Sequence, residues 1–413
     1  MGRIWKLVWG RIKRFASMIA RIAEKPLNRA RLLVRGNIRQ YGMIIALGFI
    51  VLFFEILTKG VLLRPMNITN LIMQTSYIHI MTIGMMLVII TGYVDLSIGS
   101  VVAATGALSA VLIIDNRVPV LWGFLAILAL GIVIGSFHGF FISVINIPPF
   151  ITTLAGMLIF RGVCQVILTG QTKGPYPSSF LTMSIGFISF VRNGRDFAAI
   201  IAGLAIIGFL IFMELRGRKS KTKYNIHVSP AYLSILKIAA MSLLIGFFAY
   251  SLSSHDGIPV ILVVIIGLAG IYTFIMKNTI LGRHIYSVGG NQNAARLSGI
   301  NIEKIKFFVF ANMGLMAALA GMVVAGRLNA ATPRAGDGYE LDAIAACYIG
   351  GASTSGGIGK IVGGIVGAMV MGVMNNGMSI MGLPIDWQRI IKGLVLLLAV
   401  WFDLYAKRKS TSA

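Results

Sequence analysis

Long apolar runs, separated by short polar or basic connections, dominate the sequence. Most runs are about 20 residues long, the length that an α-helix needs to cross a hydrocarbon core of about 30 Å. We predict membrane-spanning helices at 41–58, 68–91, 96–114, 120–145, 150–169, 196–213, 231–252, 258–276, 307–327, 361–381 and 385–405. A shorter Gly-rich stretch, 341–356, is expected to be a short or broken span. The pattern predicts an all-α, polytopic transmembrane helix bundle of about 10–12 spans.

The basic residues divide the connections into two groups. Lys and Arg are concentrated in 214–230 and 277–306, whereas 115–119 and 253–257 carry acidic residues and a histidine. Because cytoplasmic loops of membrane proteins are rich in Lys and Arg, we expect the first two connections to be cytoplasmic. Both chain ends then lie in the cytoplasm, provided that 341–356 counts as a crossing.

The first 40 residues are basic and contain no long apolar core. Their apolar residues recur at helical spacing, at Ile4, Val8, Ile12, Phe15, Ile19 and Ile22. This pattern suits a helix lying on an anionic inner leaflet, although a solvated basic tail and a mitochondrial presequence are the other interpretations. We therefore expect a cytoplasmic N-terminal tail (1–40), a membrane domain (41–406) and a cytoplasmic C-terminal tail (407–413).

Composition supports a membrane protein and argues against nucleic-acid binding. Hydrophobic residues make up 57% of the chain and charged residues 12%, with a mean hydropathy of +0.86. The net charge is +24, but the positive residues lie in the tails and between apolar runs, so nucleic acid is not an expected partner. Cys164 and Cys347 belong to no CxxC or Cys/His cluster, so we expect free cysteines and no metal site.

Two spans carry glycines four residues apart. One contains Gly131, Gly135 and Gly139, and the other contains Gly359, Gly363 and Gly367. Small residues at this spacing allow two helix backbones to approach closely. Packing alone and packing around a solute pathway both fit the pattern.

Asp95 places a carboxylate between two apolar runs, in the stretch TGYVDLSIGS (91–100) that also holds Ser97. A charge near the hydrocarbon costs on the order of 3 kcal/mol unless it has a partner or water. We expect Asp95 either to cap the helix that follows or to belong to a solute or gating site. His79 and His138 have no ligand-type neighbours at suitable spacing, so we expect hydrogen-bonded interior histidines rather than metal ligands.

Other polar residues also interrupt apolar stretches. Thr152 and Thr153 follow a Pro-Pro pair, and either local capping or a hydroxyl pair facing a sugar fits them. Asn375 and Asn376 lie within an apolar helix, where hydrogen bonds between helices or contact with a solute would explain them. Asp342 is expected to cap the short Gly-rich segment or to line the outer mouth of a pathway.

The basic connection 277–306 contains a short predicted helix, because Ala294-Ala295-Arg296-Leu297 follows an Asn-Gln-Asn sequence and Gly299 can end it. A short helix at the inner surface suits docking to a cytoplasmic partner, and a solvated connection is the alternative. The residues that we assign to this docking surface are Gly289, Gly290, Asn291, Ala294, Ala295, Arg296 and Gly299.

The stretch GGASTSGGIGK (350–360) is not a phosphate-binding loop. A Walker A motif needs Gly and Ser or Thr where this chain has Thr354 and Ile361. No clustered acid, base or metal constellation indicates a catalytic site either. We therefore expect no enzyme activity and no cofactor in this chain, so ATP and Mg²⁺ would be used by a partner subunit.

Four stretches together carry a family resemblance: TGYVDLSIGSVVAATGA (91–107), PPFITTLAGM (148–157), VGGNQNAARLSGIN (288–301) and DAIAACYIGGASTSGGIGKIVGGIVGA (342–368). In this order they resemble the membrane permease subunits of bacterial ABC importers for monosaccharides, the group that serves ribose, xylose and galactose. The extra apolar run near 214–257 is similar to the longer xylose or multiple-monosaccharide type. The resemblance implies the ABC importer permease fold, located in the bacterial inner membrane in contact with its lipids.

The same resemblance implies the partners. They are a second permease subunit, expected to be an identical copy, a cytoplasmic ABC ATPase subunit and an extracytoplasmic sugar-binding protein. The loop 288–301 would dock on the ATPase. The sugar pathway would lie near Asp95, Ser97, Thr152, Thr153, Asp342, Asn375 and Asn376.

The expected function is thus monosaccharide uptake by alternating access, driven by ATP that a partner hydrolyses. The alternative is a secondary transporter driven by an ion gradient. Such a transporter needs titratable or ion-binding residues inside the membrane, and Asp95 and Glu55 are the acidic candidates within the apolar runs.

Overall fold

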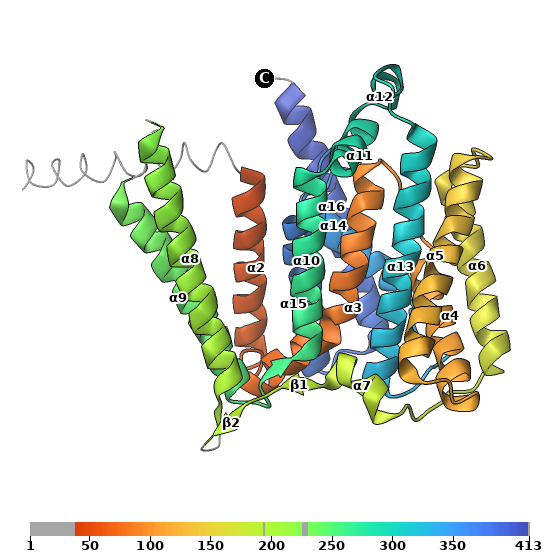
Figure 1. Cartoon of the computed structure of the whole chain (residues 1–413), viewed down its shortest axis with the longest axis horizontal. Helices are drawn as coiled ribbons and strands as arrows, with labels where there is room; N and C mark the ends of the chain where they lie inside the picture. The colour runs from red at the N-terminus through yellow and green to blue at the C-terminus, as the bar shows by residue number, and fades with distance from the viewer. Residues whose placement is uncertain (1–37, 193–194, 225–229, 412–413) are drawn as a thin grey trace, which may run out of the picture.

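The computed structural model describes residues 38–192, 195–224 and 230–411, and it is a bundle of helices (Figure 1). The predicted N-terminal interfacial helix lies outside the described residues, whereas residues 407–411 of the predicted C-terminal tail continue the last helix. The helices are α2 Ile38–Leu57, α3 Pro65–Ile90, α4 Ile98–Ala110, α5 Val120–Ser143, α6 Pro149–Leu168, α7 Ser178–Ile185, α8 Phe197–Lys223, α9 Ala231–Ser253, α10 Val260–Asn278, α11 Ile280–Gly290, α12 Gln292–Leu297, α13 Ile302–Leu328, α14 Tyr339–Ile349, α15 Ile361–Ile380 and α16 Ile385–Thr411.

Strands play a small part in the described chain. β1 (Phe187–Ile188) pairs with β4 (Ile258–Pro259), and β2 (Val191–Arg192) pairs with β3 (Arg195–Asp196), both antiparallel. These short pairs tie together the connections beside α7. The predicted all-α class is confirmed.

The helices run between two ends of the bundle (Figure 1). We call the end that carries α11 and α12 the α12 end, and the opposite one, which carries α7 and the strands, the α7 end. The basic segments 214–224 and 277–306 lie at the α12 end, together with the end of α16. The connections 115–119 and 253–257 lie at the α7 end. The two groups of connections distinguished by charge are therefore on opposite sides.

Nine of the described helices are long and apolar enough to span a membrane. They are α3, α4 with the π-helical turn Val111–Asp115 that extends it, α5, α6, α8, α9, α10, α13 and α15. These helices correspond to nine of the predicted runs, and apart from the end of α8 their ends differ from the prediction by a few residues. α2 and α16 run beside them over similar lengths (Figure 1).

The Gly-rich stretch 341–356 is a broken crossing, one of the forms that the sequence predicted. Its helix α14 ends at Ile349, and the chain then continues without regular structure. The backbone N–H of Gly357 donates a 2.8 Å hydrogen bond to the carbonyl of Ile90, at the last residue of α3. Irregular backbone at membrane depth is tolerated where protein surrounds it and supplies such partners.

The centre of the bundle is formed by α3 and α13, which are buried over most of their lengths. α13 packs extensively on α5, and the glycines of α5 make this contact possible. A Cβ built on Gly131 would lie 2.6 Å from the carbonyl oxygen of Gly314, and one on Gly139 would lie 3.0 Å from that of Phe307. The predicted close packing at the Gly131 series is confirmed.

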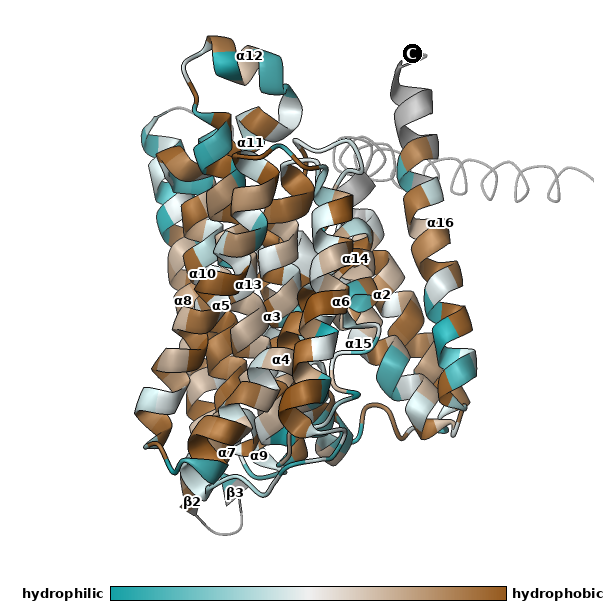
Figure 2. Ribbon diagram, turned by 90° about the vertical axis from the view of Figure 1, so that its right-hand side faces the viewer, coloured by the Kyte–Doolittle hydropathy of each residue, from teal (hydrophilic) through white to brown (hydrophobic). Residues whose placement is uncertain are grey.

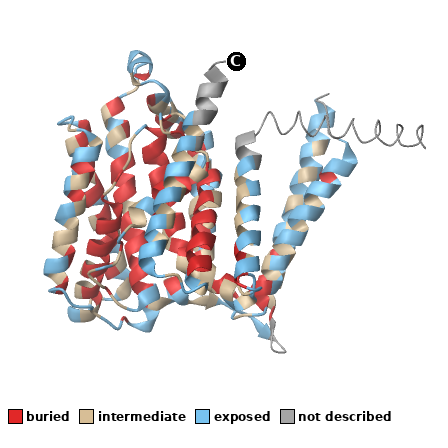
Figure 3. Ribbon diagram, turned by 180° about the vertical axis from the view of Figure 1, so that it is seen from behind, coloured by how far each residue is buried: buried red, intermediate tan, exposed pale blue. Residues whose placement is uncertain are grey.

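The outer helices carry the apolar surface. Figure 3 shows buried residues concentrated in the middle of the bundle and exposed residues on α2, α8 and α9. Figure 2 shows that the long helices of the bundle are largely hydrophobic, and the spans on α8 and α9 are strongly apolar although little of them is buried. α8 and α9 pack mainly on each other. Exposed apolar helices are expected where lipid is the solvent.

The helix α8 is longer than its apolar run. We predicted a loop from residue 214, whereas α8 continues to Lys223. Arg and Lys are good helix formers, and at the helix C-terminus they interact favourably with the macrodipole. A basic composition therefore marked the membrane boundary without marking the end of the helix.

Candidate functional site

The segment α11–α12 forms an exposed projection at the α12 end (Figure 1). As predicted, a short helix follows Asn291, whose side chain accepts the backbone N–H of Ala294 at 3.0 Å and thereby caps α12. Gly299 has a φ of 81° just beyond the helix, a conformation that suits glycine at a helix end. The projection is therefore defined by local capping on both sides.

The side chains of α12 differ in what they offer to a partner. Ala295, which we assigned to the docking surface, is 3% exposed and packs inward. Leu297, which we did not assign, is 91% exposed. Arg296 is exposed and forms a 2.7 Å ion pair with Glu303. An apolar side chain so exposed between Arg296 and Ser298 is the feature of α12 that best suits a protein contact.

Three backbone segments meet where α11 ends. A Cβ on Gly289 would lie 2.8 Å from the carbonyl carbon of Ile90 and 2.7 Å from the amide nitrogen of Gly357. Tyr286 donates a 2.7 Å hydrogen bond to the carbonyl of Gly359, and burial raises the pKa of Tyr286, which keeps its hydroxyl protonated. α11 is thus locked to the end of α3 and to the irregular half of the broken crossing. A Cβ on Gly290, by contrast, would meet open space.

A side-chain contact also links α12 to the interior. The Gln292 amide donates a 2.7 Å hydrogen bond to the hydroxyl of Tyr93, and the Lys306 ammonium lies 5.4 Å from the centre of the same ring. Tyr93 stands two residues before Asp95 in the segment that joins α3 to α4. This contact could not be predicted from the sequence, because its partners are far apart in the chain.

Asp95 and Ser97 are buried and bonded to each other. One Asp95 carboxylate oxygen accepts the backbone N–H of Ser97 at 2.8 Å and its hydroxyl at 2.6 Å. Ser100 in turn donates to the carbonyl of Ser97 at 2.7 Å. Since Ser97 is the residue that precedes α4, the carboxylate stabilises the turn leading into that helix. α4 has no side-chain cap, so the capping role predicted for Asp95 is not observed. The other predicted role, in a solute or gating site, stays a prediction.

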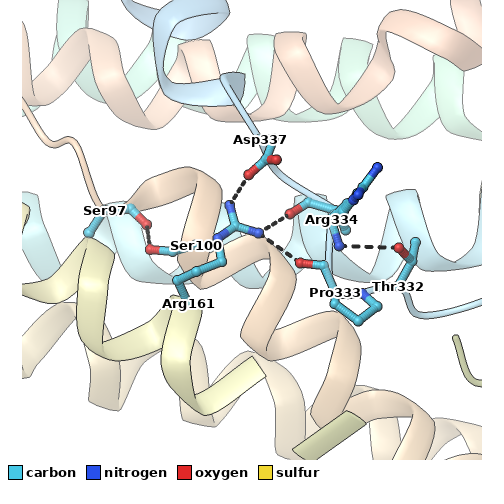
Figure 4. Close-up of polar contacts among 8 residues, drawn as sticks. Ser97, Ser100, Arg161, Thr332, Pro333, Arg334 and Asp337 are labelled. Carbon is cyan, nitrogen blue, oxygen red and sulfur yellow. Dashed lines mark hydrogen bonds and ion pairs between the residues drawn. The ribbon is translucent and has the colours of Figure 1, made fainter. Parts of the chain in front are cut away.

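Arg161 organises the loop between α13 and α14 (Figure 4). Its guanidinium donates to the carbonyls of Pro333 and Ala335 at 3.1 and 2.7 Å and pairs with Asp337 at 2.9 Å. Gly336, in the same loop, lies directly against the backbone of Gly99 in α4. We did not single out Arg161, although a cation within a predicted span is a recognisable signal of a specific partner.

A second buried cluster joins α14 to its neighbours. Asp342 is fully buried and receives the Lys392 ammonium at 3.0 Å, the Asn375 amide at 3.3 Å and the Tyr77 hydroxyl at 3.4 Å. The Tyr77 ring stacks on Tyr339 with ring centres 4.0 Å apart. The residue that precedes α14 is Gly338, without a side-chain cap, so the capping role predicted for Asp342 is wrong. Its carboxylate instead joins three other helices.

The remaining predicted polar residues make contacts within the protein. Asn376 donates to Gln74 at 3.2 Å and accepts from Asn67 at 2.9 Å, which joins α15 to α3. Thr152 and Thr153 each donate at 3.4 Å to a backbone carbonyl of the first turn of α6. The Pro-Pro pair therefore begins α6, whereas α5 ends five residues earlier.

The two interior histidines differ from each other. His79 contacts the carbonyl of Thr75 at 2.9 Å, as expected for a hydrogen-bonded histidine. His138 is buried, and its Nε2 has no hydrogen-bond partner among the described residues. The prediction of a satisfied His138 is wrong in this respect, because Gly156 brings the backbone of α6 against the ring and leaves little room for a donor.

The structure therefore groups the predicted residues into separate clusters. Asp95 and Ser97 lie beside Tyr93 and the α12 projection, and Asp342 and Asn375 form the buried ion-pair cluster. Glu340 of α14 lies against Gly99 of α4, so these clusters are neighbours. Cys164 and Cys347 are free and buried, as predicted. The fold and these clusters define the class of a polytopic membrane transport protein, with polar groups held inside a helix bundle and a helical projection at one end.

Comparison with known proteins places the chain more narrowly. Residues 67–400 match the family described as "Branched-chain amino acid transport system / permease component". The match covers most of the chain, and the chain belongs to this permease family. No solved structure matches the chain.

Named relatives include sugar permeases. The chain is 38% identical over 379 residues to the xylose transport system permease protein of Haemophilus influenzae, covering 90% of this chain and 98% of the relative. It is 39% identical over 384 residues to that of Escherichia coli, covering 91% and 94%. The ribose import permease protein of Escherichia coli is 36% identical over 337 residues, covering 82% and 85%. The resemblance to monosaccharide permeases is confirmed.

Proposed function

We propose that this chain is the permease subunit of an ATP-driven importer of a monosaccharide, with xylose as the leading substrate. The proposal rests on the similarity to two xylose permeases over nearly their full lengths. The chain would supply the pathway and no catalytic group, because ATP and Mg²⁺ would be held by a separate ABC ATPase subunit.

The proposed location of the protein is the bacterial inner membrane, with the α12 end and both chain ends in the cytoplasm. The basic residues at the α12 end support this orientation under the positive-inside rule. They include Arg216, Lys219 and Lys221 at the end of α8 and Lys277 and Arg283 near α11. The α7 end would then face the sugar-binding protein.

The observation that carries the proposal is the attachment of the α12 projection to the interior. Leu297 is exposed for a partner, while Gly289 and Gln292 fix the projection to the end of α3 and to Tyr93. Movement imposed on α12 by an ATPase would therefore reach the segment 91–97. This is the connection that alternating access driven from the cytoplasm requires.

The sugar pathway would run beside the buried polar clusters. Carboxylate and amide groups such as those of Asp342 and Asn375 suit the hydroxyls of a sugar. The carboxylate of Asp95, the amide of Asn376 and the hydroxyls of Ser97, Thr152 and Thr153 complete the proposed set. Their present hydrogen bonds are to other protein groups, so a sugar would compete with them. We therefore propose that the permease binds sugar weakly and that the binding protein provides the selection.

We also propose that two copies of this chain form the pathway, since a symmetric pair is the simplest closed assembly. Chemical cross-linking in native membranes should give a species of twice the chain mass. A pair made of this chain and a different permease subunit would contradict this part of the proposal without affecting the rest.

Reconstitution in vesicles tests the function. The full chain, the ATPase subunit and the sugar-binding protein together should accumulate labelled xylose when ATP is supplied on the α12 side. Omitting any one component should abolish uptake, and a proton uncoupler should not. Labelled ribose and leucine are the controls for substrate class. Accumulation by this chain alone, or uptake abolished by the uncoupler, would establish the secondary transporter instead.

A further inference from the structure

An apolar groove runs along the outside of the bundle between α2, α15 and α16. Its volume is about 420 Å³, and every lining side chain is apolar. Phe49, Phe53 and Leu57 form the α2 wall, Met378 lies on the α15 side, and Ile391 and Val395 form the α16 wall. The groove exists because α2 packs mainly on α15 while α16 packs mainly on α14.

The groove covers the depth of one leaflet. The step from Phe49 to Leu57 along α2 corresponds to about 12 Å of helix. Half of a hydrocarbon core measures about 15 Å. Leu57 is the last residue of α2 at the α7 end, so the groove extends inward from that surface.

The lining decides what can occupy the groove. Water and sugars are excluded by the absence of polar groups in the lining. A hydrocarbon chain matches both the apolar lining and the length of about 12 Å.

We propose that the groove holds one acyl chain of a phospholipid from the leaflet at the α7 end, wedged between α2 and α16. Unfilled space would deprive the lining side chains of dispersion contacts on one side. An acyl chain restores those contacts and connects two helices that otherwise lack a common surface. The occupant thereby stabilises the position of α2.

Charges at the mouth of the groove fit a phosphate group. Lys59 follows α2 and Arg64 precedes α3, and both are exposed without an ion pair to any described residue. Trp387 is 58% exposed and lies one turn before Ile391 on the same face of α16. An interfacial Trp beside cations is typical of the headgroup level.

The acidic residues nearby leave this positive character in place. Glu55 accepts the backbone N–H of Leu63 at 3.0 Å, so it is turned into the connection that follows α2. Asp386 and Arg389 lie five and two residues before Ile391 on α16, so both are turned away from the groove-lining face of that helix. Lys59 and Arg64 therefore give this end of α2 a positive character that suits an anionic headgroup.

Native mass spectrometry of the full chain, extracted from membranes in mild detergent, tests the proposal. One phospholipid per chain should survive activation that strips the detergent. Val395→Trp, which fills the groove, should reduce the retained fraction by about tenfold or more. The matched control is Leu397→Trp, because Leu397 is 66% exposed on the same helix but does not line the groove.

A second variant tests the headgroup without altering the packing. Lys59→Gln combined with Arg64→Gln should lower phosphatidylglycerol retention and leave the melting temperature of lipid-free protein unchanged. Retention by Val395→Trp equal to that of Leu397→Trp would overturn the proposal, as would wild-type protein that retains no phospholipid. Dimers that dissociate on Val395→Trp without lipid loss would assign the groove to a second copy instead.

Discussion

The side-chain amide of Gln292 donates a 2.7 Å hydrogen bond to the hydroxyl of Tyr93, although the two residues are 199 positions apart. Gln292 begins the exposed helix α12, and Tyr93 stands two residues before the buried Asp95. The contact therefore connects α12, on which a cytoplasmic partner would act, with the segment that holds the buried Asp95 carboxylate.

Removing this hydrogen bond should weaken coupling without unfolding the protein. Tyr93→Phe and Gln292→Leu each delete one net hydrogen bond, worth about 0.5–1.5 kcal/mol. We expect sugar uptake per ATP hydrolysed to fall by about twofold to tenfold, measured in vesicles with all partners present. Since both changes remove the same bond, the double variant should be no worse than either single one. Additive losses would mean that the two residues act separately.

The glycine pair at the end of α11 should respond unequally to alanine. Gly289→Ala would drive a methyl group into the backbone at Ile90 and Gly357, whereas Gly290→Ala meets open space. We expect the first change to destabilise the protein by about 1–3 kcal/mol or more and the second to be close to neutral. Thermal unfolding of purified protein measures the difference. Equal melting temperatures for Gly289→Ala and Gly290→Ala would show that the backbone at Ile90 and Gly357 can move away from α11 at little cost.

Removing only one partner of the buried ion pair between Asp342 and Lys392 should lower the stability of the protein strongly. Lys392→Met leaves the fully buried carboxylate without its cation, at a cost of about 3–5 kcal/mol. The double variant Asp342→Asn, Lys392→Met removes both charges, and we expect it to recover much of that loss. Melting temperatures and expression of the three variants give the comparison. A double variant less stable than Lys392→Met would contradict this explanation.

Arg161 should hold the loop 332–338 in place, because its guanidinium binds two carbonyls and one carboxylate of that loop at the same time. Arg161→Lys keeps the charge but cannot reach two carbonyls and a carboxylate together, so it should rescue only part of the effect of Arg161→Met. We expect faster hydrogen exchange in 332–338 for both variants, and more for Met. Arg334→Gln is the matched control, since in Figure 4 the Arg334 guanidinium points away from Arg161 and its partners. Unchanged exchange in Arg161→Met would exclude the positioning role.

Leu297 provides a test of partner docking that leaves the fold intact. Leu297→Ser alters a side chain that is 91% exposed, so the melting temperature should be unchanged while affinity for the ATPase subunit falls. Ala295→Asp would instead bury a charge at a position that is 3% exposed, and should destabilise α12. Pull-down of the ATPase by each variant, with melting curves alongside, separates docking from folding. Full ATPase binding by Leu297→Ser would remove Leu297 from the interface.

Contacts that depend on local sequence were predictable. The cap at Asn291, the positive φ at Gly299 and the packing glycines of α5 follow from rules about neighbouring residues. The predicted spans were found because a bilayer imposes a length on every helix that crosses it. The end of α8 was missed because charge marks the membrane boundary, while the helix continues as long as its residues favour it.

Contacts between distant segments were not predictable from one chain. A local cap is one of the two roles that the sequence predicted for Asp342, but its partners come from α3, α15 and α16. Arg161 was visible as a charge inside a span, yet nothing local indicated that it holds the loop after α13. His138 looked like an ordinary interior histidine until the packing of α6 against it left one nitrogen unpartnered.

The sequence by itself determined that lipid surrounds this protein, where its helices cross the membrane and to which family it belongs, since hydropathy, charge and motif order are all read along the chain. Only the tertiary structure decided which polar groups meet, how α12 is joined to Tyr93, and where α2 and α16 leave a groove. The physical reason is that lipid imposes the same demand on every apolar helix, whereas the pairing of buried charges depends on which helices pack together.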